Sequence, residues 1–402
     1  MTTSANSRAQ APASAPRPPL LTRALMLRFV SMVGASVSFY LLLSTVPAYA
    51  GTAGGGGGAG LATGALMFST VLGELVSPRL VARHGNRRPL MAGLFLLGAP
   101  ALLLTVSHGL VWIVAVCLVR GLGFAVTIVA GGAMTAALIP AKRRGEGLAL
   151  VGVVGGVPSL VALPLGLWLA RHVGYGPVAV TAGAAALAAI ASVPALPDGR
   201  PENPEAGRSA LGMTAALRTP ALRRPSLVFA TTALAAGILV TFLPLAVSSA
   251  PAGVVAVALL VQPAASTAAR WVAGRHGDRH GTARLVVPGL LLSAAGVLVT
   301  AATVSPVAVV AGSALFGTGF GIAQNATLTL MYTRAARSSY GTVTAVWNLA
   351  YDAGMGVGAA GFGLLAGRTG YAWAFTLTAA AMLLALGPAL RDGRVMSESR
   401  PR

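Results

Sequence analysis

Residues 79–88 read RLVARHGNRR, and residues 275–284 read RHGDRHGTAR. The two stretches share three arginines, a histidine and a glycine, each pair of matches 196 residues apart. The same distance relates RGLGFA at 120–125 to FGTGFG at 316–321, and it relates Gly174-Tyr175 to Gly370-Tyr371. A constant register over nearly 200 residues, with charged residues among the matches, predicts two structurally related halves.

The composition places this duplicated chain in a membrane. Charged residues make up 9% of the 402 residues, compared with about 25% in a typical soluble domain. Hydrophobic residues make up 55%, and the 51 glycines suit helices that pack closely in lipid. Cys117 is the single cysteine, which excludes a disulfide within the chain. The net charge of +20 comes largely from short basic segments between apolar runs, so we expect contact with membrane lipid and no nucleic-acid partner.

Twelve apolar runs are each close to the ~20 residues that cross a bilayer as a helix. Only helices and closed barrels span lipid, and these runs are too long for barrel strands. We therefore predict an all-α membrane protein with twelve transmembrane helices in two six-helix bundles related by the internal repeat. The predicted spans are 25–47, 59–81, 89–107, 110–138, 147–170 and 175–196, then 226–248, 252–273, 284–304, 306–330, 341–365 and 371–391.

These spans divide the chain into an N-terminal bundle at 25–196 and a C-terminal bundle at 226–391. The polar segment 197–225 is predicted to link them in the cytoplasm. Residues 1–24, rich in Ala, Pro, Ser and Arg, are predicted to form a disordered cytoplasmic tail, and residues 392–402 a second cytoplasmic tail.

The basic residues also predict the orientation. They concentrate in the loops on one side, including Arg79 and Arg270, whereas the opposite loops hold only Arg171 and Arg368. The positive-inside rule then places both termini of this multi-pass plasma-membrane protein in the cytoplasm. The sequence Ala-Tyr-Ala at 48–50 resembles a signal-peptidase site, but the preceding apolar run is longer than that of a signal peptide. We therefore expect the first helix to remain uncleaved.

The sequence GRHGDRHG at 274–281 resembles the Gly-x-x-x-Asp-Arg-x-Gly signature of the major facilitator superfamily, which lies between the eighth and ninth helices. The earlier copy, PRLVARHG at 78–85, keeps the arginine and the last glycine but lacks the first glycine and the aspartate. The sequence RGLG at 120–123 is similar to a pattern common in the proton-coupled members. The chain is most similar to the drug and metabolite efflux branch, although its fifth span has only a loose relative of that branch's Gly-Pro pair.

The repeated basic turns are candidates for a cytoplasmic gate. Their arginines are suited to bond carbonyls at helix C-termini and to pair with nearby acids, which would lock the two bundles together in one state and release them in another. The alternative is that these arginines only set topology and contact lipid phosphates. The candidate gating residues are Arg83, Gly85, Arg87, Arg88, Gly274, Asp278, Arg279 and Gly281.

Charges inside the predicted spans are few. Of the nine acids, Glu74 in the second span and Asp352 in the eleventh lie within the membrane, where a charge costs about 2.5–3.5 kcal/mol unless it faces a cavity or a partner. Asp352 lies near mid-membrane and is the candidate for proton or substrate binding; the alternative is a permanently bonded structural acid. For Glu74 the alternative is a snorkelling or arginine-paired structural role. Arg120 in the fourth span is the matching cation, which would pair with a carboxyl group, hold a substrate anion or form a fixed structural ion pair.

Other polar residues are candidates to line a substrate cavity, and each has an interhelical hydrogen bond as its alternative role. They are Tyr40, Gln324, Asn325, Asn348 and Tyr351. In the superfamily, helices 1, 4, 7 and 10 surround the cavity, so the resemblance favours the first three. Five consecutive glycines at 54–58 predict a flexible loop, and no GKS or GKT follows them to bind a nucleotide phosphate. The histidines lack metal-ligand spacing, so we expect no metal, no cofactor and no enzymatic activity.

These features predict a secondary active transporter that exports a small organic molecule, a drug or a metabolite, in exchange for protons, by alternating access between the two bundles. One alternative is a proton-coupled importer of a sugar, an amino acid or another nutrient; few polar groups in the cavity disfavour a sugar. A non-transporting membrane sensor or assembly factor is the remote alternative, because the sequence has no soluble domain through which to signal. The expected partners are a small-molecule substrate, protons and membrane lipid, and we expect a monomer.

Overall fold

The first helix, α1, runs from Arg23 to His84 and covers the first two predicted spans in one kinked element. Residues 54–58 were expected to form a loop, but only Gly54 and Gly55 depart from helical backbone angles. Glycine tolerates such angles without a steric cost, and a Cβ on Gly55 would meet nothing within 4 Å. The glycine run therefore produces a sharp bend between two helical segments rather than an extended loop.

The computed structural model describes residues 21–140, 143–197, 213–247, 251–336 and 339–391. Residues 1–20 of the first predicted tail, the whole second tail and residues 198–212 of the predicted linker lie outside these ranges, and α1 begins at Arg23, inside the predicted range of the first tail. After α1, the elements are α2 (Arg87–Leu103), α3 (Leu110–Leu138), α4 (Arg144–Val173), α5 (Tyr175–Ile190), α6 (Met213–Arg218), α7 (Pro220–Ala246), α8 (Ala252–His280), η2 (Thr282–Leu285), α9 (Val286–Thr300), α10 (Pro306–Thr333), α11 (Tyr340–Thr369), α12 (Tyr371–Met382) and η4 (Leu383–Ala385).

The all-α membrane fold is confirmed. The described ranges contain no strand, and nine helical segments within them are long and apolar enough to cross a membrane. One of the nine is α1, whose 62 residues are enough for two crossings on either side of the kink. The apolar helix α5 is shorter, at 16 residues. The count of twelve crossings therefore stays a prediction.

The backbone reproduces the internal repeat. Gly85 and Gly281, which are 196 residues apart, end α1 and α8 with φ angles of 76° and 91°. Gly174 and Gly370 do the same after α4 and α11, with φ angles of 89° and 78°. Such positive φ angles favour glycine, because an L side chain would be strained there. The matches that revealed the repeat in the sequence thus include the residues that end equivalent helices.

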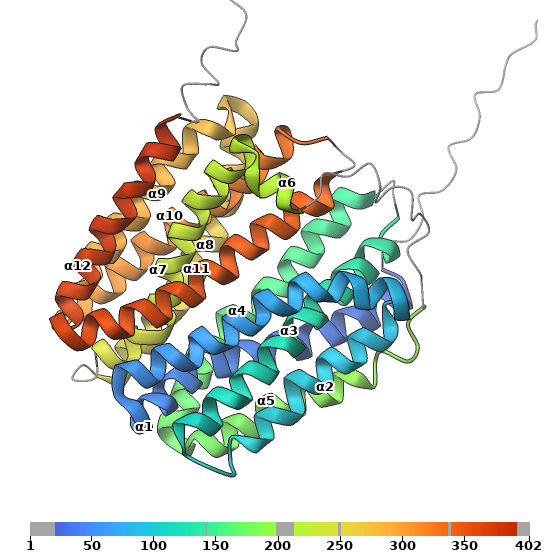
Figure 1. Cartoon of the computed structure of the whole chain (residues 1–402), viewed down its shortest axis with the longest axis horizontal. Helices are drawn as coiled ribbons and strands as arrows, with labels where there is room; N and C mark the ends of the chain where they lie inside the picture. The colour runs from blue at the N-terminus through green and yellow to red at the C-terminus, as the bar shows by residue number, and fades with distance from the viewer. Residues whose placement is uncertain (1–20, 141–142, 198–212, 248–250, 337–338, 392–402) are drawn as a thin grey trace, which may run out of the picture.

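The two halves form two groups of helices (Figure 1). Helices α1–α5, blue to green, lie together, and helices α7–α12, yellow-green to red, lie together beside them. Each group has buried apolar clusters, one around Leu94 and Met134 and another around Phe316 and Phe375. Close glycine contacts hold neighbouring helices at equivalent positions of both halves, because small residues let backbones approach in lipid.

The halves meet where the second segment of α1 packs against α11 and α7. The hydroxyl of Thr241 in α7 donates to the hydroxyl of Thr63 in α1, at 3.0 Å. Gly60 lies so close to the carbonyl oxygen of Ala359 in α11 that a Cβ on Gly60 would stand 2.5 Å from it. These contacts lie in the half of each helix nearer the α1 kink, and they bring the inward-facing residues of α1 and α11 together.

Candidate functional site

Two acidic side chains meet at the boundary between the bundles. The carboxyl groups of Glu74 in α1 and Asp352 in α11 lie within hydrogen-bonding reach of each other. Asp352 is only 5% exposed, and the Oε2 atom of Glu74 is buried without a hydrogen-bond partner among the described residues. Ionised carboxylates only accept hydrogen bonds, so a bond between two carboxyl groups requires a proton on one of them. A proton held by this pair would link the two halves of the molecule.

The sequence around Asp352 explains this close approach. Gly356 lies one turn after Asp352 on α11, and a Cβ placed there would stand 2.8 Å from the Cβ of Met67 in α1. A Cβ placed on Gly64 of α1 would likewise stand 3.2 Å from the Cβ of Ala360 in α11. Small residues on both helices let the backbones pack closely. As a result, carboxyl groups from two helices come within bonding reach of each other.

Two tyrosines lie within electrostatic reach of Asp352, and Arg270 lies within electrostatic reach of both tyrosines. Tyr40 of α1 interacts with Asp352 and with Arg270 of α8. Tyr351 of α11 interacts with Tyr40, Asp352 and Arg270. The cluster thus combines residues from α1, α8 and α11, and so from both bundles. The structure brings together four predicted residues from two categories: the acids Glu74 and Asp352, and the cavity candidates Tyr40 and Tyr351.

Arg270 was missed as a site residue. Its charge was attributed to a cytoplasmic loop, whereas α8 continues for ten residues beyond it, to His280. Its side chain remains exposed although it lies well inside the helix, and it interacts with both tyrosines of the cluster. One signal in the sequence could have identified it: Arg270 is the repeat equivalent of Glu74, 196 residues later.

Aromatic packing orients the Tyr351 side of the cluster. The ring of Phe229 stacks on Trp347 with centroids 4.2 Å apart, and it stacks more loosely on Tyr351, at 5.9 Å. The indole Nε1 of Trp347 donates to the hydroxyl of Thr327, at 3.1 Å. This stack of rings from α7 and α11 limits the rotation of Tyr351 and so helps to position the residue beside Asp352.

Arg120, which was predicted to pair with an acid or a substrate anion, is tied to the backbone. Its Nε donates to the carbonyl oxygen of Leu97, at 3.2 Å, and its Nη2 to the carbonyl oxygen of Ser38, at 3.0 Å. The residue is 1% exposed. These bonds connect α3 with α2 and α1 inside the first bundle. A role for Arg120 in coupling stays a prediction.

The remaining cavity candidates are half-buried. Gln324 and Asn325 lie on α10, and Asn348 lies on α11 one turn before Asp352. The amide nitrogen of Asn325 stands 3.3 Å from where a Cβ of Gly274 would lie, so this side chain faces α8. Their contact with a substrate stays a prediction.

The candidate gating motifs lie mainly on helices rather than in loops. Gly274, Asp278 and Arg279 belong to the end of α8, which Gly281 terminates. In the earlier copy Arg83 lies in the last turn of α1 and Gly85 follows it, and Arg87 and Arg88 begin α2. Asp278, Arg279 and Arg83 are exposed, and Asp278 forms no ion pair within the described ranges. The gate therefore stays a prediction.

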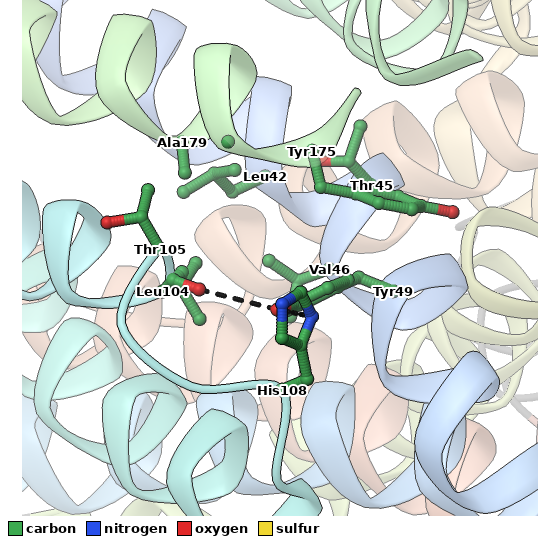
Figure 2. A pocket seen from close by; sticks show the side chains of 10 residues that line it. Leu42, Thr45, Val46, Tyr49, Leu104, Thr105, His108, Tyr175 and Ala179 are labelled. Carbon is green, nitrogen blue, oxygen red and sulfur yellow. Dashed lines mark hydrogen bonds between the residues drawn. The ribbon is translucent and has the colours of Figure 1, made fainter.

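A second polar site, which the sequence did not indicate, lies inside the first bundle (Figure 2). The hydroxyl of Tyr49 lies 2.6 Å from Nδ1 of His108, and the rings of Tyr49 and Tyr175 are 4.9 Å apart. They line a cavity of about 180 Å³ together with Thr45 and Thr105. No group of His, Cys, Asp and Glu within the described residues has the arrangement of a metal site.

Comparison with known proteins agrees with this architecture. The model of the Major Facilitator Superfamily matches residues 28–359 and 252–401. A protein of Streptomyces lividans described as a chloramphenicol resistance protein is 30% identical over 381 residues, which cover 90% of this chain and 95% of that protein.

Several solved transporters share the fold at low sequence identity. The POT family transporter PepTSo has a TM-score of 0.78 at 13% identity, over 95% of this chain and 100% of that chain. A bacterial homologue of the human lysosomal transporter Spinster, inward-facing and occupied, has a TM-score of 0.76 at 14% identity, over 96% and 99%. The nucleoside transporter NupG has a TM-score of 0.73 at 11% identity, over 92% and 100%.

Proposed function

We propose that this chain, which belongs to the Major Facilitator Superfamily, exports a small organic molecule across the plasma membrane in exchange for protons. The observation that carries the proposal is the close approach of the carboxyl groups of Glu74 and Asp352 between the two bundles. A carrier coupled to protons needs a group that alternates between protonated and ionised as access switches. This pair provides such a group at the place where the bundles move relative to each other.

The pair would act by holding or losing its shared proton. With the proton, Glu74 and Asp352 bond and hold α1 against α11. Without it, two carboxylates about 4 Å apart repel by about 4 kcal/mol at an effective dielectric constant of 20. That energy is enough to shift a two-state equilibrium by more than a hundredfold. Loss of the proton would therefore favour an arrangement in which α1 and α11 separate at this level.

Arg270 would stabilise the ionised state. Arg270 of α8 lies within electrostatic reach of Tyr40 and Tyr351, and both tyrosines lie within electrostatic reach of Asp352. A guanidinium stays protonated under working conditions and offers five donors to a carboxylate. Movement of the bundles would exchange the Glu74 contact of Asp352 for one with this cation, directly or through the tyrosine hydroxyls.

The export direction and the first substrate to test come from the relative of Streptomyces lividans, whose description is that of a resistance protein. Chloramphenicol is a neutral aromatic molecule with hydroxyl and amide donors, and export of such a molecule would protect the cell. Structural neighbours described as nucleoside and peptide transporters share only the fold, because their identity is 11–16%. They favour no particular direction for this chain.

The test uses the full chain in inverted membrane vesicles with an acidic lumen and an internal pH dye. Addition of chloramphenicol should raise the luminal pH as substrate enters and protons leave. Vesicles without the protein give the baseline. Uptake of substrate without proton movement would refute proton exchange, and uptake only in right-side-out vesicles would refute export. A panel of other small aromatic and amine compounds extends the same measurement if chloramphenicol gives no flux.

A further inference from the structure

An apolar groove opens on the flank of the molecule beside the acid pair. It has a volume of about 450 Å³ and lies between the second segment of α1, α3 and α11. Phe68 and Val357 form its outer walls and are 61% and 65% exposed. Leu118 of α3 closes it on the third side. Such exposed apolar side chains on a membrane helix face lipid, so the groove opens toward the bilayer.

One feature of this groove does not fit a surface that only contacts lipid. Asp352, 5% exposed, lies at its floor, and it is the one polar side chain among the described residues that line the groove. The small residues Gly64, Ala353 and Gly356 around it create the hollow. A buried carboxyl group at the base of an apolar groove offers one polar group to which a molecule that enters from the bilayer can donate a hydrogen bond.

We propose that the transported molecule enters this groove directly from the bilayer, and that it belongs to the class of lipophilic molecules that carry a hydrogen-bond donor. Its apolar body lies between Phe68 and Val357, and its N–H or O–H group donates to the carboxylate of Asp352. The inference rests on the proposed function, and it adds the chemical class of the substrate and its route of entry.

Binding in this position couples substrate to proton. Asp352 accepts the donor of the substrate in place of the hydrogen bond that it shares with Glu74. The O–H bond of the shared proton then breaks and the proton leaves to water, so that the donor of the substrate replaces it at the carboxylate. A phospholipid tail has no donor and leaves the acid pair intact, so the chemistry of the floor favours a donor-bearing molecule over lipid.

The test measures binding of rhodamine 6G, a lipophilic cation with two N–H groups, to the full chain in nanodiscs by fluorescence polarisation. Val357→Trp fills the groove from its wall and should weaken binding at least tenfold. Leu364→Trp is the matched control, because Leu364 is 73% exposed on the same helix and does not line the groove; it should stay within twofold of wild type. Ala353→Leu fills the floor and should act like Val357→Trp. Rhodamine B ethyl ester, a cation without N–H groups, should bind wild type at least tenfold more weakly.

The outcomes separate this inference from the proposed function. If wild type binds neither dye, or if Val357→Trp and Ala353→Leu bind rhodamine 6G as wild type does, the groove holds lipid only and the inference is overturned. Substrate-dependent proton flux in wild-type vesicles would leave the proposed function standing in that case. Conversely, if binding depends on the groove but the protein moves no protons, the groove is supported as a binding site and proton exchange is overturned.

Discussion

The substitution Asp352→Asn tests the role of the acid pair most directly. Asparagine keeps the shape of aspartate and its amide can donate to Glu74, so the contact between α1 and α11 persists. What is lost is the proton that two carboxyl groups share. We expect the variant to fold and to bind substrate, because Gly356 and Gly64 still set the approach of the helices.

The expected magnitude follows from one shared proton per acid pair. If one proton crosses for each substrate molecule, a pH difference of one unit supplies about 1.4 kcal/mol, which supports an accumulation of about tenfold. Wild type should therefore approach a tenfold substrate gradient in proteoliposomes with one unit of imposed pH difference. Asp352→Asn should reach no gradient, while exchange of labelled for unlabelled substrate partly continues.

The assay follows labelled substrate in proteoliposomes with and without a protonophore. The result that would refute the reasoning is an Asp352→Asn variant that still accumulates substrate about tenfold and loses this gradient when the protonophore is added. Glu74→Gln serves as the partner variant. It should also reduce accumulation if the pair acts as a unit, and wild-type accumulation in Glu74→Gln would limit the coupling group to Asp352.

Three further predictions concern the frame around the site. Reporter fusions at residue 86 should report the cytoplasm and fusions at residue 368 the outside, and the reverse pattern would contradict the predicted orientation. If the motif acts as the predicted gate, Asp278→Asn should slow transport at normal protein levels; wild-type turnover would reduce the motif to a topology signal. Arg28→Met removes a buried arginine with three side-chain hydrogen bonds and should lower the free energy of unfolding by about 2–3 kcal/mol, measured by thermal denaturation in detergent, whereas the exposed control Arg23→Met should be nearly neutral.

Local signals explain why much of the fold was predictable from the sequence. The span predicted at 110–138 has the bounds of α3, because apolar length and flanking polar residues are properties of the segment itself. The ends of other helices were misjudged for a physical reason. The predicted span 252–273 stopped before the run of charged residues that begins at Arg275, but arginine, histidine and aspartate do not break a helix, and α8 ends only where Gly281 adopts a positive φ.

The site was predictable residue by residue but not as an arrangement. Glu74 and Asp352 were each singled out because a charge in the membrane needs a reason. Their contact with each other was not predicted, because it depends on the packing of two helices from opposite halves of the chain. The partners of Arg120 were not predictable for a similar reason. The side chain donates to the backbone carbonyls of Leu97 and Ser38, and no sequence pattern marks a particular carbonyl as a partner.

The internal repeat indicates where function has departed from the duplicated frame. Gly93 and Gly289 keep equivalent close contacts with α3 and α10, because both bundles need them to pack. At the interface between the halves the repeat instead carries different chemistry. Glu74 has Arg270 as its equivalent, and Asp352 has Gly156. One symmetry-related contact, α1 with α11, therefore holds two acids, whereas the other, α4 with α8, has an arginine and a glycine at the equivalent sequence positions. Because packing alone would keep the two contacts alike, this divergence of charge favours a coupling role for the α1–α11 contact and a countercharge role for Arg270.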